Sequence, residues 1–362
     1  MPSWTRVDAH GAGDADKPMN ADSTLPAGTR HRALLAVVLA AGAGTRLGRL
    51  TETRSKAMMP IVGQPMIGRV LEMLAAGGAR RFIVVAHRED RELVAHLRRS
   101  SWADQTRLAY QDQRMGMVHA LKCAAPLIRQ EDVTSFLLSS CDSLYPEGHV
   151  ARLVQRHRQD PRDATLTVMW TSPQAAASSA LVVLQDGIVE DIIEKPSGRQ
   201  IAERAPTSAP LTAPSLYALS TSILDHLHQV DASDRGEYEF PDALRFLIAA
   251  GGKVGVQVVR GRMTLTHPSD LLALNRHFLG ADPTAPAVER VLPPGTVLVP
   301  PVRIEAGARL GGGCRIGPEV YLERGCRVHG RGAVARSVVL RDGSVEPRHA
   351  VDGAVIGGGD KV

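Results

Sequence analysis

The chain has 362 residues and a formal net charge of only +5, from 43 Lys and Arg against 38 Asp and Glu. This length exceeds what one small core needs, so two domains with terminal segments are expected. The basic residues are scattered and aromatic residues make up only 4% of the chain, which argues against a nucleic-acid partner. No apolar run approaches the roughly 18 residues of a membrane span, so no membrane partner is expected.

Residues 1–31 contain Gly, Asp, Pro, Asn, Ser and Ala without periodicity, which predicts a disordered leader. Residues 30–32 read Arg-His-Arg before the apolar run ALLAVVLAA, a pattern that mimics a signal peptide. Cleavage there would destroy the glycine motif that follows, so a cytoplasmic location is predicted. The cysteines lack CxxC spacing, which predicts free thiols in a reducing compartment: Cys123, Cys141, Cys314 and Cys326.

A glycine-rich loop follows the first apolar run. Residues 33–40 predict a buried parallel strand, and AGAGTR follows at 41–46. Gly42 and Gly44 let backbone N–H groups turn toward a ligand, while Arg46 and Lys56 add positive charge, so a triphosphate is the expected guest. A dinucleotide fingerprint would need a third glycine at position 47, which is Leu, and a Walker loop would need Gly-Lys-Ser/Thr. A simple Gly-rich turn with solvated basic residues stays open.

Apolar patterning after this loop alternates between helical and extended periods. Helices are predicted at 65–76, 90–99, 116–128 and 147–156, and strands at 82–86, 107–111, 134–139, 164–170, 180–183 and 187–194. This order predicts an α/β fold with a doubly wound, mostly parallel sheet over residues 32–280. Ligands of such sheets bind beyond the carboxyl ends of the strands.

The segments AAGAGTRL and SKAMMPIVGQPMI resemble the motif of the sugar-1-phosphate nucleotidyltransferases, notably the glucose-1-phosphate thymidylyl- and uridylyltransferases. The resemblance covers nearly all of residues 33–357 and implies transfer of a nucleotidyl group from a nucleoside triphosphate to a sugar-1-phosphate, with Mg²⁺ as cofactor. Arg46, Lys56 and Lys195 are the catalytic residues that it implies. It places the nucleotide on Leu39, Ala41, Gly42, Gly44, Thr45, Arg46, Gln111 and Gly116.

Gln111 and Gly116 have the spacing at which pyrimidine-specific members of this family read the base. An amide offers one donor and one acceptor, which match the N3–H and carbonyl of uracil or thymine. UTP or dTTP is therefore favoured over a purine nucleotide. Met117 departs from the residue that relatives often carry, and a surface glutamine at a strand end is the plain alternative.

The resemblance also supplies a metal ligand and a sugar site. Asp142 follows an apolar strand where a Mg²⁺ that bridges phosphates would be held, with helix capping as the alternative. The tripeptide at 194–196 resembles the family's sugar-site motif, with Glu194 toward sugar hydroxyls and Lys195 toward the sugar phosphate. Tyr217 is assigned to the same sugar-phosphate site.

Four further positions depart from the family pattern. Cys141 replaces a Gly before the metal ligand, and Ala180 and Ser215 replace glycines that line the sugar. Thr264 stands where relatives carry a second metal-binding Asp, and a hydroxyl is a poorer Mg²⁺ ligand than a carboxylate. Asp270 nearby is assigned to the first turn of the next helix. These departures leave room for an atypical sugar or a cyclitol phosphate.

The C-terminal region repeats every six residues. Apolar residues recur at Leu298, Ile304, Leu310, Ile316, Leu322, Val328, Val334 and Leu340. This period predicts a left-handed parallel β-helix over 292–357, after a linker at 281–291 and before a tail at 358–362. Cys314 and Cys326 are then interior residues. Self-association into a homo-oligomer or docking on the catalytic domain is the expected role.

Two rivals to an active nucleotidyltransferase stay open. Thr264, Cys141 and Ser215 fit a catalytically impaired regulatory or assembly subunit of the same fold. The residues that argue against it are the intact Arg46, Lys56, Asp142 and Lys195. An acyltransferase that uses the β-helix is disfavoured by the short repeat.

Overall fold

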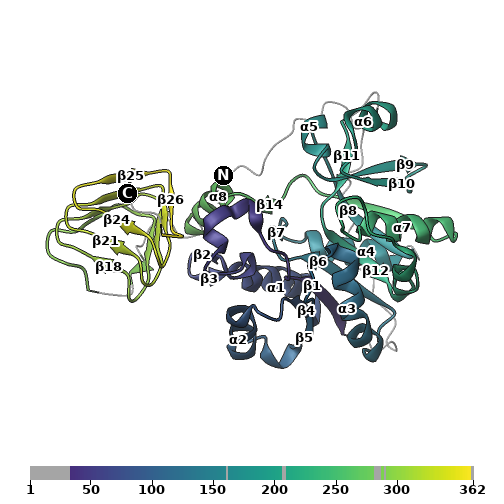
Figure 1. The fold of residues 1–362 in the computed structure, drawn as a ribbon, viewed down its shortest axis with the longest axis horizontal. Coiled ribbons are helices and arrows are strands. Elements are labelled where there is room, and N and C mark those ends of the chain that lie inside the picture. The colour runs from purple at the N-terminus through teal and green to yellow at the C-terminus, as the bar shows by residue number, and fades with distance from the viewer. Residues whose placement is uncertain (1–32, 160–161, 206–208, 281–286, 289–290, 360–362) are drawn as a thin grey trace, which may run out of the picture.

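The computed structural model describes residues 33–159, 162–205, 209–280, 287–288 and 291–359. The predicted leader lies outside these residues, as do most of the predicted linker and residues 360–362 of the tail. Figure 1 shows an α/β body with a yellow β-helix at one end of the molecule.

One mixed sheet forms the centre of the body, in the order β10-β9-β11-β8-β12-β6-β1-β4-β5, with β13 paired to β8. Its strands are β1 (Leu34–Leu39), β4 (Ala79–Ala86), β5 (Thr106–Tyr110), β6 (Ser135–Ser140), β8 (Ala164–Trp170), β9 (Ala180–Gln185), β10 (Ile188–Glu194), β11 (Leu211–Ala213), β12 (Leu216–Ser220) and β13 (Val254–Val258). Strands β6, β1, β4 and β5 are parallel, as predicted. Strand β12 runs antiparallel to both β6 and β8. It therefore joins the parallel half to an antiparallel half made by β8, β11, β9 and β10.

Helices cover both faces of the sheet, because side chains of β1 alternate between two cores. Ala36 and Val38 pack with helices α1 (Met66–Ala76), α2 (Arg91–Arg99), α4 (His149–Gln159) and α8 (Pro268–Leu279). Leu35 and Val37 pack with α3 (Gly116–Gln130) and α7 (Phe240–Ala249). The predicted doubly wound α/β class is confirmed.

The short helices α5 (Pro173–Ala176) and α6 (Gly198–Arg204) lie beside β9, β10 and β11, at the far edge of the antiparallel half (Figure 1). Two-stranded ladders complete the body: β2 (Pro60–Ile61) with β3 (Gln64–Pro65), and β7 (Ser143–Leu144) with β14 (Met263–Thr264). The predicted helices and strands are all present, with ends shifted by a few residues.

Three parallel sheets form the β-helix, in the orders β15-β17-β20-β23-β26, β16-β19-β22-β25 and β18-β21-β24. Their bounds are Ala287–Val288, Val297–Leu298, Val302–Ile304, Arg309–Leu310, Arg315–Ile316, Val320–Leu322, Arg327–Val328, Ala333–Ala335, Val338–Val339, Ser344–Val345, Ala350–Asp352 and Val355–Ile356 for β15 to β26. Cys314 and Cys326 are fully buried in the interior, as predicted, and the described cysteines are all free. Strand β15 pairs with β17, so the first sheet begins inside the predicted linker.

The six-residue register breaks at Leu340, which the sequence placed inside the β-helix. Val339 pairs with Leu322 and fills the interior, so this coil is one residue shorter than the preceding coil. Leu340 instead packs into the core of the α/β body together with Tyr321 and Val338. The prediction that Leu340 lies in the β-helix interior was wrong. The sheet that contains β20 and β23 packs its outer face against apolar side chains of the α/β body, and Leu340 lies in that contact.

Helix α8 lies at that junction, against β23 and β26 (Figure 1). The ion pair between Arg276 of α8 and Glu319, with 2.7 Å between Nε and Oε2, closes one side of it. Docking of the β-helix on the α/β body, one of the two predicted roles, is therefore observed.

Candidate active site

The glycine-rich loop leaves β1 and enters a 3-10 helix, η1 (Thr45–Thr51). Gly44 has φ 68°, and a Cβ there would lie 3.1 Å from side-chain carbons of Thr51 and Lys56, so no larger residue fits without displacing them. A Cβ on Gly42 would meet nothing within 4 Å, so this backbone faces open space. The loop therefore offers an unobstructed backbone surface to a ligand.

A cavity of about 430 Å³ lies over this loop. Lys56 and Asp142 line it together with all of the predicted nucleotide-binding residues: Leu39, Ala41, Gly42, Gly44, Thr45, Arg46, Gln111 and Gly116. These residues come from the ends of β1, β5 and β6, from the start of α3, and from η1 and a second 3-10 helix, η2 (Lys56–Met58), at the carboxyl edge of the parallel half.

Gln111 is buried and held in place by two hydrogen bonds. Its Nε2 donates to the Gly116 carbonyl at 3.1 Å and lies 3.1 Å from His119 Nδ1. Gly116 has φ 88°, and a Cβ there would lie 2.8 Å from the Tyr238 carbonyl oxygen. The spacing of Gln111 and Gly116 thus reflects a direct contact, and both bonds use the amide nitrogen rather than its oxygen.

Lys56 and Asp142 form the charged centre of the site. Lys56 Nζ lies 2.5 Å from Asp142 Oδ2, while the hydroxyls of Ser140 and Ser143 donate to Oδ1 at 2.8 and 3.0 Å. Burial acts to raise the pKa of Asp142, but the Lys56 ammonium and the Ser140 hydroxyl hold it below its usual value. Asp142 is therefore a carboxylate anion at neutral pH.

A second cavity of about 880 Å³ adjoins the first, and the two share Gly42, Arg46 and Asp142 among their lining residues. All of the predicted sugar-site residues line it: Glu194, Lys195 and Tyr217. Ala180 and Ser215, the positions at which relatives carry glycine, also lie in its wall. The structure thus brings the predicted nucleotide and sugar residues to neighbouring cavities, with Asp142 between them.

The sugar-site residues differ in exposure and charge. Burial and the nearby carboxylate of Glu239 raise the pKa of Glu194, and Lys195 Nζ lies 3.9 Å from Glu194 Oε1. Lys195 adopts φ 43°, a left-handed conformation unusual for a side chain with a Cβ. Tyr217 is buried and stacks on Phe240 with 5.0 Å between ring centroids, so it forms an apolar wall.

Thr264 lies beside the metal-ligand candidate. Strand β14 pairs Thr264 with Ser143, and the N–H of Leu265 donates to the Asp142 carbonyl at 2.8 Å. Asp270 accepts from the backbone N–H groups of Thr266 and His267 and lies in the first turn of α8, as the sequence predicted.

The donor set at this site suits Mg²⁺ only in part. Asp142 and Thr264 offer hard oxygen atoms, the ligand type that Mg²⁺ prefers. Among the described residues, no group of three or more His, Cys, Asp or Glu side chains gathers to hold a metal ion. A Mg²⁺ ion bound at Asp142 would thus depend on phosphate oxygens for most of its ligands.

Three functional candidates were missed in the sequence. Arg114 donates through Nε to the Ala41 carbonyl at 2.9 Å, and Arg262 donates to the Ser143 hydroxyl at 2.6 Å. Glu237 lines both cavities. Arg114 lies between Gln111 and Gly116, and Arg262 lies two residues before Thr264, so nearness to those positions was the available signal.

Comparison with known proteins defines the class. The nucleotidyl transferase family model matches residues 35–264. The chain therefore belongs to this family, and the resemblance drawn from the sequence is confirmed.

The helices of the described residues are all too short or too polar to span a membrane.

Individual relatives are more distant. The chain is 30% identical over 237 residues to a UTP–glucose-1-phosphate uridylyltransferase, AglF, of Haloferax volcanii, covering 65% of this chain and 92% of the relative. A glucose-1-phosphate thymidylyltransferase of Streptomyces griseus is 26% identical over 340 residues, 89% of this chain and 91% of the relative. A crystal structure of UDP-glucose pyrophosphorylase with UDP-glucose shares the fold, with a TM-score of 0.60 and 19% identity over 69% of this chain and all of that chain.

Proposed function

We propose that this chain joins a nucleoside triphosphate, UTP or dTTP, to a sugar-1-phosphate and releases pyrophosphate. The observation that carries this proposal is the pair of adjoining cavities that share Gly42, Arg46 and Asp142. One cavity offers a glycine loop and a base-reading amide, and the other offers Lys195 and Glu194. The uridylyl- and thymidylyltransferases among the relatives support the same reaction class.

The reaction requires two polyanions to meet. A phosphate oxygen of the sugar-1-phosphate attacks the α-phosphorus, a new P–O bond forms, and the bond to the β-phosphate oxygen breaks, so that pyrophosphate leaves. No covalent enzyme intermediate is needed, and catalysis consists of positioning and charge neutralisation. Arg46 is assigned to the β- and γ-phosphates, Lys56 to the α-phosphate and the leaving oxygen, and Lys195 to the attacking phosphate.

Mg²⁺ is the proposed cofactor. Asp142 would hold it together with the nucleotide phosphates, and it would supply charge neutralisation between the two substrates. Lys56 now contacts Asp142 Oδ2, and a phosphate in the first cavity would compete with Asp142 for this ammonium.

The pyrimidine preference follows from the orientation of Gln111. Because Nε2 is committed to Gly116 and His119, the amide oxygen is the group assigned to the base. This oxygen accepts the N3–H that uracil and thymine carry.

The side chains of Ala180 and Ser215 occupy wall positions where relatives have glycine, which favours an atypical sugar or a cyclitol phosphate as the acceptor. The predictions of a cytoplasmic location and of self-association also stay predictions.

Pyrophosphate release over a substrate panel tests the proposal. UTP, dTTP, GTP and ATP are each combined with hexose-1-phosphates and cyclitol phosphates at saturating Mg²⁺. Release with UTP or dTTP is expected for at least one acceptor. A preference for GTP or ATP of about tenfold or more, roughly 1.4 kcal/mol, would refute the base assignment.

A further inference from the structure

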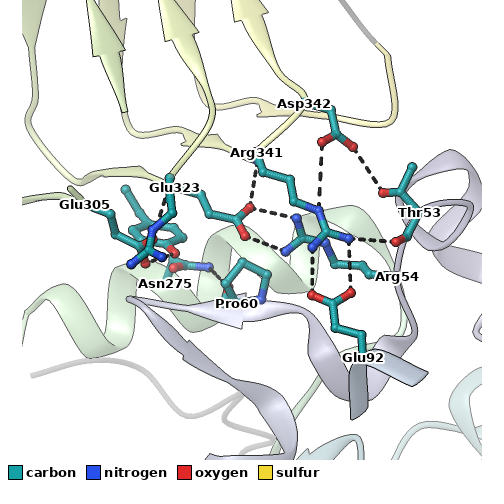
Figure 2. A network of polar contacts seen from close by, with 11 residues as sticks. Thr53, Arg54, Pro60, Glu92, Asn275, Glu305, Glu323, Arg341 and Asp342 are labelled. Atoms are coloured by element: carbon teal, nitrogen blue, oxygen red, sulfur yellow. Dashed lines mark hydrogen bonds and ion pairs between the residues drawn. The ribbon is translucent and has the colours of Figure 1, made fainter. Parts of the chain in front are cut away.

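The segment between the glycine loop and Lys56 is held by the β-helix rather than by the sheet alone. Residues 52–55 follow η1 and lead directly to Lys56, which begins the 3-10 helix η2 (Lys56–Met58). Figure 2 shows three of the contacts from the β-helix to this region, made by Glu323, Arg341 and Asp342.

The first of these contacts is a bidentate ion pair. Arg54 Nη1 lies 2.7 Å from Glu323 Oε1, and Arg54 Nη2 lies 3.0 Å from Glu323 Oε2. Both side chains are nearly buried, at 3% and 12% exposed. A bidentate pair fixes direction as well as distance, so the backbone at Arg54 is oriented by a residue of the β-helix.

Arg341 makes the second contact and joins three parts of the chain. Its Nη1 and Nη2 lie 2.7 and 3.1 Å from the carboxylate oxygens of Glu92 in α2. Nη2 also donates to the Thr53 carbonyl at 2.7 Å, while the Arg341 backbone N–H donates to Glu323 Oε2 at 2.7 Å. The two β-helix residues therefore form one connected network (Figure 2).

A third contact from the β-helix holds the segment before Lys56, and a contact from α8 holds the segment after it. The Thr53 hydroxyl donates to Asp342 at 3.1 Å. Beyond Lys56, Asn275 of α8 donates to the Pro60 carbonyl at 3.3 Å and accepts from the Val62 N–H at 2.8 Å. The part of the segment just before Lys56 is thus held from the β-helix, and the part after it is held from α8.

Lys56 itself packs against the glycine loop. The position of a Cβ on Gly44 lies 3.1 Å from Lys56 Cβ and 3.1 Å from Thr51 Cγ2. A shift of residues 52–55 would therefore displace both Lys56 and the start of η1, which carries Arg46. Misplacement of such groups by about 1 Å is enough to slow a reaction by as much as 10²-fold.

We propose that Glu323 and Arg341 of the β-helix are positioning residues for Lys56 and Arg46, acting through Arg54 and Thr53. This inference rests on the proposed function for its effect on turnover, whereas the ordering of residues 45–58 does not depend on any activity. The β-helix then has a catalytic consequence within a single chain, besides any role in assembly.

A matched control lies in the same interface. Arg276 and Glu319 also join the body to the β-helix, at 2.7 Å, but neither contacts residues 45–58 in the network described. Glu323→Gln and Glu319→Gln each remove one interfacial carboxylate charge, so they separate positioning from docking.

Two measurements on the full chain test the proposal: steady-state kinetics, and hydrogen–deuterium exchange of the amides of residues 45–58. Glu323→Gln is expected to lower kcat by about tenfold, with KM for the nucleotide changed by less than about threefold. Exchange at 45–58 should accelerate by roughly fivefold or more. Glu319→Gln should change neither quantity, and Arg54→Lys should retain more activity than Arg54→Gln because it keeps the charge.

Other results would overturn the proposal or the proposed function. Equal effects of Glu323→Gln and Glu319→Gln, or no effect of Glu323→Gln, would overturn the proposal. If Glu323→Gln does not fold, Arg341→Gln carries the same expectations. A wild type inactive with every substrate pair would refute the proposed function, while the exchange data would still decide whether the β-helix orders residues 45–58.

Discussion

The Lys56 ammonium and the Asp142 carboxylate lie 2.5 Å apart, so the two opposite charges neutralise each other. The same ammonium could instead bind a substrate phosphate, and the same carboxylate could bind a metal ion. The Ser140 and Ser143 hydroxyls fix the carboxylate from the other side. A triphosphate that enters the first cavity can take over Lys56 and leave Asp142 to a cation. Because the partners exchange, the Lys56 ammonium and the Asp142 carboxylate are paired both before and after the substrate binds, although the site is partly buried.

Gln111→Glu tests the base-reading amide at the residue scale. A carboxylate at this position loses both donors to Gly116 and His119 and faces the Gly116 carbonyl. We expect kcat/KM for UTP and dTTP to fall by about 10- to 100-fold, or roughly 1.4–2.7 kcal/mol. The exposed Gln113→Glu in the same loop is the control. A loss of similar size in both variants would contradict a specific role for Gln111.

Thr264→Asp tests the metal assignment. Because Thr264 pairs with Ser143 next to Asp142, a carboxylate there would add a second anionic ligand beside the first. The free Mg²⁺ needed for half-maximal activity should fall by about tenfold, or about 1.4 kcal/mol. The measurement is a Mg²⁺ titration of both proteins at saturating nucleotide. An unchanged midpoint would show that Thr264 is not the missing ligand.

At the scale of elements, α4 packs on β8 through two histidines. His149 is fully buried with Nε2 3.0 Å from the Thr167 hydroxyl, and His157 Nδ1 lies 3.1 Å from the Thr165 hydroxyl. Burial, and to a lesser degree Arg152, lower the pKa of His149 to about 4, and burial also lowers the pKa of His157. Both rings are therefore neutral in the folded chain at pH 7.

This arrangement predicts loss of stability in mild acid. An unfolded His149 takes up its proton near pH 6.5, while the folded one resists until about pH 4, so stability falls as the pH drops through this window. Between pH 7 and pH 5, the His149 contribution to the free energy of unfolding should decrease by about 2 kcal/mol. Urea unfolding at both pH values measures it. His149→Asn should reduce the difference, whereas the exposed His349→Asn should not.

The elements of the parallel half were predictable because their apolar periodicity and end signals are local. Asp90 illustrates this, since it caps α2 by accepting from the Leu93 N–H at 3.0 Å. The direction of β12 was not predictable from such signals, because a strand's pattern of buried residues is the same whether its neighbour runs parallel or antiparallel. Arg114 was missed for a related reason: its contact with Ala41 spans segments that only the folded sheet brings together.

At the scale of the whole molecule, the β-helix and the catalytic body share apolar surface as well as the ion pairs. Tyr321, Val338 and Leu340 lie on the outer face of one β-helix sheet and are buried in the core of the body. The six-residue repeat predicted the β-helix itself correctly. It could not reveal the docking face, because Leu340 continues the interior period in sequence while pointing outward in space.

Leu340→Ala tests this docking face. Truncation of a buried leucine leaves a cavity and should lower the free energy of unfolding by about 2–4 kcal/mol. Calorimetry should also show the unfolding of the two domains beginning to separate. Leu310→Ala, at a half-buried position of the β-helix interior, is the comparison. A smaller cost for Leu340→Ala than for Leu310→Ala would contradict the burial of Leu340 between the domains.

The most direct test of the central claim compares pyrophosphate release by the wild type and by Lys56→Ala, with the substrate pair that the wild type uses best. Loss of the charge next to the reacting phosphates should lower kcat by 10²–10⁴-fold, or roughly 2.7–5.5 kcal/mol. Thermal stability should fall as well, because Asp142 loses its ion-pair partner in a partly buried site. Lys253→Ala, at an exposed lysine outside both cavities, should keep wild-type turnover. Near-normal turnover of Lys56→Ala would contradict the phosphate site. A wild type inactive on the whole panel would instead identify a non-catalytic member of the family.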